Sequence, residues 1–160
     1  MKTTLVLLGL SLFFSPAWAN DDHHGPFPEN ATFKTLVLTG LAIEGLTGDD
    51  HGNLYTTGRT PGAGLPCPVW RVTVATGSVT QVGSVPAPSG TGQCSPSGLA
   101  FGPDGRLFIT ETDKIYSLTP DESSPPVGTL FATGVPGTNG LAFDRDGNLW
   151  TGDGTTGQGR

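Results

Sequence analysis

One short pattern occurs three times along this chain, at residues 44–55, 97–108 and 139–150. The three segments read EGLTGDDHGNLY, SGLAFGPDGRLF and NGLAFDRDGNLW, and they align without a gap. In each segment a Gly-Leu pair precedes a short strand, an acidic turn ends in glycine, and leucine with an aromatic residue opens the next strand. Glycine supplies the positive φ angle that a tight turn between antiparallel strands needs. The pattern therefore predicts three hairpins of the same construction.

Further strands are predicted after the first two hairpins, at residues 69–74, 80–85, 114–118 and 128–132. The repeats begin 53 and 42 residues apart, close to the ~40–50 residues of a four-stranded propeller blade. The chain has 25 glycines and 14 prolines, and beyond residue 19 its apolar residues do not recur at helical spacing. We therefore expect an all-β chain. Residues 33–160 are predicted to form a partial β-propeller of about two and a half four-stranded blades, in which residues 33–38 are an outer strand. A ring needs at least ~4 blades, so the remaining blades are expected beyond residue 160, with pairing of two half-rings as the alternative.

The first 19 residues have the composition of a secretory signal. A basic start at Lys2 is followed by an apolar run over residues 5–14 and by Ala17-Trp18-Ala19, and this run is too short for the ~20 residues of a membrane span. We therefore expect cleavage after Ala19, export to the periplasm or the outside, no membrane insertion of the mature chain, and a flexible polar segment over residues 20–32. Cleavage removes one lysine and no acid, which changes the formal charge from −6 to −7. An acidic chain argues against nucleic acid as a partner.

Cys67 and Cys94 are the only cysteines. Export places them in a compartment where a disulfide persists, and the absence of a nearby histidine pattern makes a metal site a poor explanation. We predict a Cys67–Cys94 bridge that fixes the Gly/Pro-rich loop over residues 60–68.

The residue before each Gly-Leu pair is the first candidate for function. Glu44, Ser97 and Asn139 hold this position, and in a propeller the equivalent starts of the innermost strands converge on one rim of the central channel. All three side chains carry oxygen, the donor that a hard cation such as Ca²⁺ prefers. The sequence leaves open whether they hold a cation or only hydrogen-bond to their neighbours across a wet channel.

A second group of candidates follows the second strand of each repeat. Arg59, Glu111 and Asp153 hold these places and are expected at the same rim. Arg59 and Glu111, together with Ser97, are predicted to contact a small-molecule substrate, and Asp153 is a candidate catalytic base or ligand. His51 lies in a hairpin turn on the opposite face and is set aside.

The opening motif resembles a known family. Ile43-Glu44-Gly45-Leu46, followed by DHGNLY at residues 50–55, is similar to the first blade of the SMP-30/gluconolactonase/LRE-like family, although Leu46 stands where the family has proline. The resemblance implies a six-bladed propeller that hydrolyses lactones with a divalent cation, usually Ca²⁺, in its channel. It implies that Glu44 binds this cation. Asn139 matches a position that orients substrate or water, with Gly140 in place of the family's aspartate.

A second resemblance competes with the first. Residues 101–111, FGPDGRLFITE, are similar to the repeat of virginiamycin B lyase and of NHL-type propellers. This resemblance implies either a lyase or a propeller without enzymatic activity that binds a ligand or a protein. Because propellers host all of these functions, the sequence predicts the fold class more narrowly than the activity.

Overall fold

The described residues belong almost entirely to the repeated region. This computed structural model describes residues 34–38, 42–59, 62, 64–88, 92–134 and 137–154. The chain divides into two units, Met1–Lys34 and Thr35–Arg160, and all ten strands belong to the second unit. The predicted signal peptide and the polar segment over residues 20–32 lie outside the described residues.

The strands form three antiparallel sheets, and each sheet begins at one copy of the repeated pattern. The first sheet contains, in spatial order, β1 (Ile43–Gly48), β2 (Asn53–Gly58), β3 (Cys67–Thr73) and β4 (Ser78–Val85). The second contains β5 (Pro96–Phe101), β6 (Leu107–Glu111), β7 (Lys114–Leu118) and β8 (Thr129–Thr133). The third contains β9 (Thr138–Phe143) and β10 (Leu149–Asp153).

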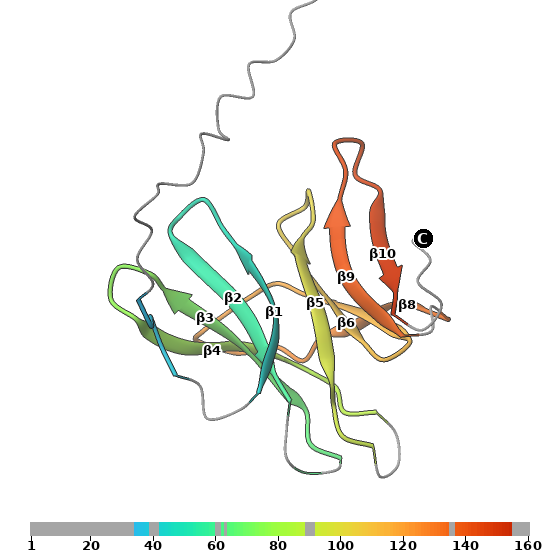
Figure 1. Cartoon of the computed structure of the whole chain (residues 1–160), viewed down its shortest axis with the longest axis horizontal. Helices are drawn as coiled ribbons and strands as arrows, with labels where there is room; N and C mark the ends of the chain where they lie inside the picture. The colour runs from blue at the N-terminus through green and yellow to red at the C-terminus, as the bar shows by residue number, and fades with distance from the viewer. Residues whose placement is uncertain are drawn as a thin grey trace, which may run out of the picture. The chain divides into compact units, whose positions relative to one another are not determined.

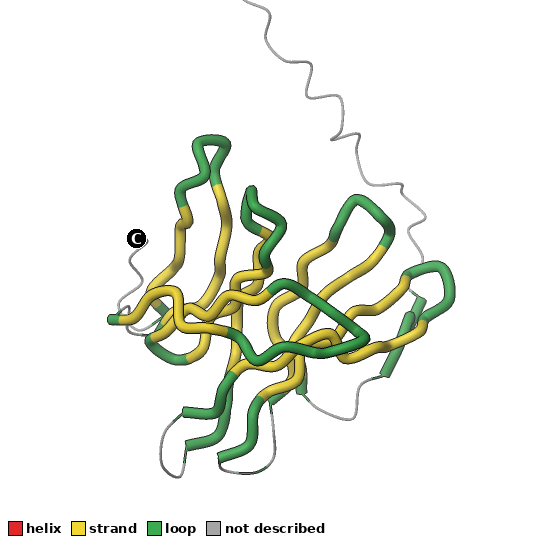
Figure 2. Tube along the Cα trace, turned by 180° about the vertical axis from the view of Figure 1, so that it is seen from behind, coloured by secondary structure: helices red, strands yellow, loops and turns green. Residues whose placement is uncertain are grey.

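The predictions of an all-β chain and of four strands in each of the first two repeats are confirmed for the described residues. Figure 2 shows only strands and loops in this part of the chain. Residues 34–38, which the sequence predicts to be an outer strand, are not in a strand. Within the described ranges, no helix is long and apolar enough to cross a membrane.

Glycines close the three predicted hairpins. Gly52, Gly105 and Gly147 have φ angles of 81°, 78° and 83°, a region that side chains with a Cβ rarely enter. Each of these glycines lies directly before the polar residue that precedes the next strand's leucine. The repeated glycine is therefore explained by the backbone conformation of the turn.

Asp49 holds the turn of the first hairpin together. Its Oδ1 accepts hydrogen bonds from the backbone N–H groups of His51 and Asn53, both at 2.9 Å. Its Oδ2 accepts from Asn53 Nδ2 at 2.9 Å and from the Tyr55 hydroxyl at 3.0 Å. Partial burial alone would raise the pKa of Asp49, but the hydrogen bonds from Asn53, His51 and Tyr55 outweigh it and lower this pKa to about 2.

Asp144 plays the same part in the third repeat. Its Oδ1 accepts from the backbone N–H groups of Asp146 at 3.0 Å and Asn148 at 2.8 Å. Its Oδ2 accepts from Asn148 Nδ2 at 2.9 Å and from Trp150 Nε1 at 2.8 Å. The hydrogen bonds from Trp150 and Asn148 lower the pKa of Asp144 to about 2. The second repeat has Gly102 at this position, so its turn is held differently.

The first strands of the three sheets lie next to one another, with β5 between β1 and β9 (Figure 1). Aromatic pairs fill the space between the sheets. Tyr55 meets Phe101 edge to face with ring centroids 4.9 Å apart, and Phe108 meets Phe143 at 5.0 Å. Such pairs favour an edge-to-face geometry. The second sheet is therefore packed on both sides, by the first sheet and by the third.

The backbones of the first strands approach very closely at two glycines. A Cβ added at Gly45 would overlap the carbonyl oxygen of Ser97, and a Cβ added at Gly98 would overlap the carbonyl oxygen of Asn139. Only glycine permits such contacts. These contacts bring the residue before each Gly-Leu pair beside its equivalent in the next sheet.

Candidate functional site

The three residues that precede the Gly-Leu pairs line one cavity. Glu44 of β1, Ser97 of β5 and Asn139 of β9 contribute to a cavity of about 420 Å³. The rest of the lining comes from Arg59, Ser95, Thr112, Gly137, Thr138 and Gly154. The lining is rich in hydroxyl groups, with one acid, one guanidinium and one amide. The structure thus brings together four of the residues that the sequence predicts to be functional: Glu44, Arg59, Ser97 and Asn139.

Glu44 and Arg59 form an ion pair at this cavity. Arg59 directly follows β2, and its backbone N–H donates to the Ala42 carbonyl at 2.9 Å. Its Nη2 donates to Glu44 Oε1 at 2.6 Å, and each side chain is about half exposed, at 46% for Glu44 and 47% for Arg59. A half-exposed pair adds little to stability, but it places a carboxylate and a guanidinium where a ligand can reach both.

The Ser97 hydroxyl donates its hydrogen bond within the protein. Its Oγ donates to the Thr138 carbonyl at 2.8 Å and lies 2.8 Å from Thr110 Oγ1. The first of these bonds joins β5 to β9. The hydroxyl of Ser97 can therefore accept a hydrogen bond from a ligand more readily than donate one.

Glu111 lies behind the cavity wall. The residue is only 2% exposed. Its Oε2 accepts from the Ser95 backbone N–H at 2.7 Å, and its Oε1 accepts from the Thr112 hydroxyl at 2.7 Å. Ser95 and Thr112 both line the cavity. The sequence predicts direct substrate contact for Glu111, but in the structure its carboxylate accepts hydrogen bonds from Ser95 and Thr112 of the cavity wall.

Asn139 of β9 and Asp153 of β10 lie at the same end of the third sheet. Asn139 is exposed and lines the cavity. Asp153, the candidate catalytic base, pairs with Thr138 in the register of β9 and β10. Its backbone therefore lies beside a residue of the lining, while its side chain is outside the described part of the structure.

A disulfide links the two complete sheets beside the cavity. Cys67, the first residue of β3, is bonded to Cys94, which precedes β5, with 5.7 Å between the Cα atoms. Both residues are fully buried. Because Ser95 of the lining directly follows Cys94, the bond fixes one part of the cavity wall. Of the predicted loop over residues 60–68, Thr60, Pro61 and Ala63 lie outside the described residues.

The described lining does not make a complete calcium site. Ca²⁺ takes six to eight oxygen ligands, several of them carboxylates. The described lining offers one carboxylate, Glu44, and Arg59 is already bound to it, so a cation on this carboxylate would lie beside a guanidinium. Among the described residues, no three or more His, Cys, Asp or Glu side chains are arranged so that they could hold a metal ion. A cation at this cavity would therefore need ligands besides the described lining.

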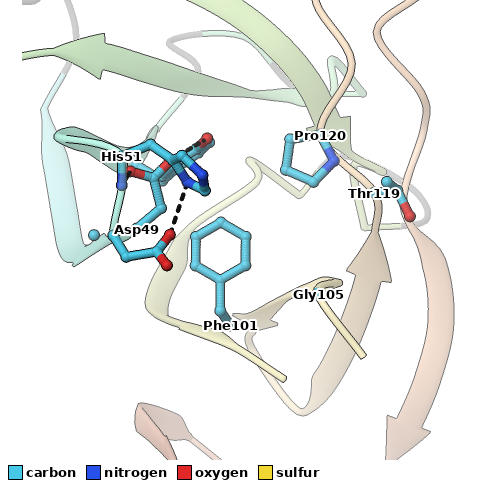
Figure 3. A pocket seen from close by; sticks show the side chains of 9 residues that line it. Asp49, His51, Phe101, Gly105, Thr119 and Pro120 are labelled. Atoms are coloured by element: carbon cyan, nitrogen blue, oxygen red, sulfur yellow. Dashed lines mark hydrogen bonds and ion pairs between the residues drawn. The ribbon is translucent and has the colours of Figure 1, made fainter. Parts of the chain in front are cut away.

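A second cavity, of about 500 Å³, lies at the hairpin turns (Figure 3). Its lining includes Asp49, His51, Phe101, Thr119 and Pro120. The carboxylate of Asp49 is used in the turn, and His51 Nδ1 lies 2.7 Å from an oxygen of Asp50. Although this cavity is larger, its lining is more apolar than polar, and two of its polar side chains, Asp49 and His51, already have partners. The smaller cavity therefore offers more chemistry to a ligand.

Comparison of the sequence with known protein families and with curated proteins finds no match.

Proposed function

We propose that the three sheets are blades of a β-propeller and that the cavity at Glu44, Ser97 and Asn139 binds a polyhydroxylated small molecule, such as a sugar or a sugar lactone. One observation carries the proposal: residues at the same position of three repeats line a single cavity. Convergence of equivalent positions is what a radial arrangement of repeats produces. Binding sites in proteins also favour a concave surface with a few convergent polar groups.

The strand order supports the radial arrangement. In the two complete sheets the chain runs from the first strand to the fourth without a crossover, and the first strands β1, β5 and β9 are neighbours. At the far side, Ser84 of β4 forms a parallel bridge with Val127, just before β8. The first and second sheets are thus in contact at both their first and their last strands, as expected for blades.

The polar groups of the lining suit a neutral ligand rich in hydroxyl groups. Glu44 accepts hydrogen bonds, Arg59 donates them, and the Asn139 amide does both. Because Glu44 and Arg59 together carry no net charge, a neutral polyol fits better than a strongly anionic ligand. The predicted signal sequence and the disulfide favour an exported protein, since disulfides persist in oxidising compartments.

Hydrolysis of a sugar lactone is the second candidate. It is favoured by a specific observation, namely that Glu44 and Asn139, the two residues that the resemblance to gluconolactonases implies, line the same cavity. In this candidate Asn139 orients the lactone or the attacking water. The cation that the resemblance implies would require ligands besides the described residues.

Calorimetric titration with glucose and with gluconolactone tests the binding proposal. Arg59→Leu and Asn139→Ala are expected to weaken binding about tenfold each, the effect of losing one good hydrogen bond. Arg106→Leu is the matched control, because Arg106 forms a similar ion pair with Asp104, at 2.6 Å, away from the cavity. Failure to bind either compound, or an equal loss of affinity in the control, would reject the proposal.

Acid release from gluconolactone above the spontaneous rate tests the second candidate. Hydrolysis that is lost on addition of EDTA and in Glu44→Ala supports a metal-dependent lactonase. An unchanged rate in both experiments rejects it, and binding without turnover leaves the ligand-binding function as the better account.

A further inference from the structure

A glycine of one first strand contacts a backbone carbonyl of the next first strand at two places, and a third glycine holds the equivalent position. Gly45 lies against the Ser97 carbonyl, and Gly98 lies against the Asn139 carbonyl. Gly140 holds the equivalent position in β9, yet a Cβ added there would meet no described atom within 4 Å. The described structure thus leaves the third glycine without the carbonyl that its two equivalents contact.

The chain also contains the other half of this contact. The carbonyl that meets each glycine belongs to the residue before the next Gly-Leu pair, and Glu44 holds that position in β1. No described glycine has the Glu44 carbonyl among its nearest atoms. Within the described structure, the third repeat therefore has a glycine that lacks its carbonyl contact, and the first repeat has a carbonyl that lacks its glycine contact.

The leucine that follows this glycine is buried against the neighbouring repeat in the second repeat and exposed in the first. Leu99 covers Gly45, since its Cδ1 would be 2.7 Å from a Cβ at that glycine, and Leu99 is only 5% exposed. Leu46 is its equivalent in β1 and is 60% exposed. By the geometry of the formed contact, Leu46 is the residue that would cover Gly140 of another chain.

The sizes of the aromatic residues in the repeats favour β1 as the strand that fits against β9 and β10. Tyr55 and Phe108 each pack against a phenylalanine of the next repeat, Phe101 and Phe143. Their equivalent in the third repeat is the larger Trp150, which is 55% exposed. The residue of the first repeat that is equivalent to those phenylalanines is Gly48. A tryptophan opposite a glycine would replace a smaller ring opposite a phenylalanine, so the sizes of Trp150 and Gly48 match each other.

We propose that β9 and β10 of one copy of this chain dock against β1 of a second copy. In this contact Gly140 meets the Glu44 carbonyl, Leu46 covers Gly140, and Trp150 occupies the space above Gly48. The contact is heterologous, because different surfaces of the two copies meet. It goes beyond ligand binding, and it adds the Glu44 side chain of the second copy to the row formed by Glu44, Ser97 and Asn139.

Sedimentation velocity of the purified full chain over a wide concentration range tests this inference. The chain is expected to self-associate. Gly140→Val is expected to raise the dissociation constant at least tenfold, because its side chain would collide with the docking carbonyl while finding open space in the single chain. Leu46→Asp is expected to do the same from the other surface. Val127→Asp is the control, since Val127 is also 60% exposed but lies outside the proposed contact.

Mixing the two variants separates this contact from a symmetrical one. Gly140→Val retains an intact β1 surface, and Leu46→Asp retains an intact β9 surface, so the mixture is expected to form mixed pairs although each variant alone is monomeric. Circular dichroism spectra like that of the unchanged chain show that both variants are folded. The inference is overturned if the unchanged chain stays monomeric at every concentration or if Gly140→Val associates as strongly as the unchanged chain. A mixture of the two variants that stays monomeric would overturn it as well.

Discussion

The backbone N–H of Gly98 donates a hydrogen bond to the hydroxyl oxygen of Thr110, with 2.6 Å between the two heavy atoms. Thr110 is fully buried, and the bond links β5 to β6 at the point where β5 also meets β9. Thr57 holds the equivalent position in the first sheet and is equally buried, but its Oγ1 has no hydrogen-bond partner within the described structure. The backbone at the two glycines also differs, since Gly45 has a φ angle of 73° whereas Gly98 is not among the glycines with positive φ.

Replacing these two threonines by valine is expected to have opposite consequences. Thr110→Val leaves the Gly98 N–H without its acceptor and should lower the free energy of unfolding by about 1–3 kcal/mol. Thr57→Val removes a hydroxyl that already lacks a partner and should leave that free energy unchanged within ~0.5 kcal/mol or raise it. Urea unfolding followed by tryptophan fluorescence measures both. Equal losses in the two variants would contradict this account.

Asp49→Asn is expected to destabilise the first hairpin. The asparagine NH₂ group cannot accept the hydrogen bonds that Asp49 Oδ2 takes from Asn53 Nδ2 and from the Tyr55 hydroxyl. The free energy of unfolding should fall by on the order of 1 kcal/mol. Asp50→Asn is the matched control, because the Asp50 side chain is 90% exposed and its ion pair is with His51, which is itself 79% exposed. A control that loses as much stability would show that the turn does not depend on Asp49.

Stability is expected to fall in acid between about pH 4 and pH 2. The pKa values of Asp49 and Asp144 are about 2 in the folded chain, below the ordinary aspartate value of 3.8. A lowered folded-state pKa means that the contribution is fully present above the unfolded-state pKa and is lost as the pH falls through the folded one. Melting temperatures measured across this range should fall less steeply for the double variant Asp49→Asn/Asp144→Asn. Parallel curves for the two proteins would refute the assignment.

Loss of the disulfide is expected to lower the free energy of unfolding by about 3.5 kcal/mol, the entropic effect of opening a loop of this length. Cys67 and Cys94 are 27 residues apart and join the first sheet to the second. Denaturant unfolding of Cys67→Ala/Cys94→Ala measures the loss, and treatment of the unchanged chain with a reductant should produce the same midpoint. A reductant that shifts the double variant as well would point to another cause.

The repeated pattern predicts the hairpins and the strand count because turns and strand periodicity are local properties. Turn glycines such as Gly105 need a positive φ angle, and the runs after each hairpin are rich in the β-branched and aromatic residues that favour strands. The same equivalence of positions explains why Glu44, Ser97 and Asn139 line one cavity as expected. Residues 34–38 fail as a strand because a run of suitable residues forms a strand only where a neighbouring edge pairs with it.

Side-chain roles were less accessible from the sequence. An acidic residue after a strand is expected at the surface, so the burial of Glu111 behind Ser95 and Thr112 depends on contacts that no local pattern contains. The roles of Asp49 and Asp144 did leave a signal, since an aspartate precedes Gly-Asn-Leu-aromatic by three residues in both repeats. The second repeat lacks both the aspartate and the asparagine, which is the correlation to look for in related repeats.

The close contacts at Gly45 and Gly98 involve the carbonyls of Ser97 and Asn139 and leave the side chains of these two residues outside the contact. An acid, an alcohol and an amide can consequently occupy the same place in successive repeats without altering the distance between strands. Exchange of these side chains gives the protein a route to a new ligand preference by single substitutions, while the glycines beside them cannot change without separating the sheets.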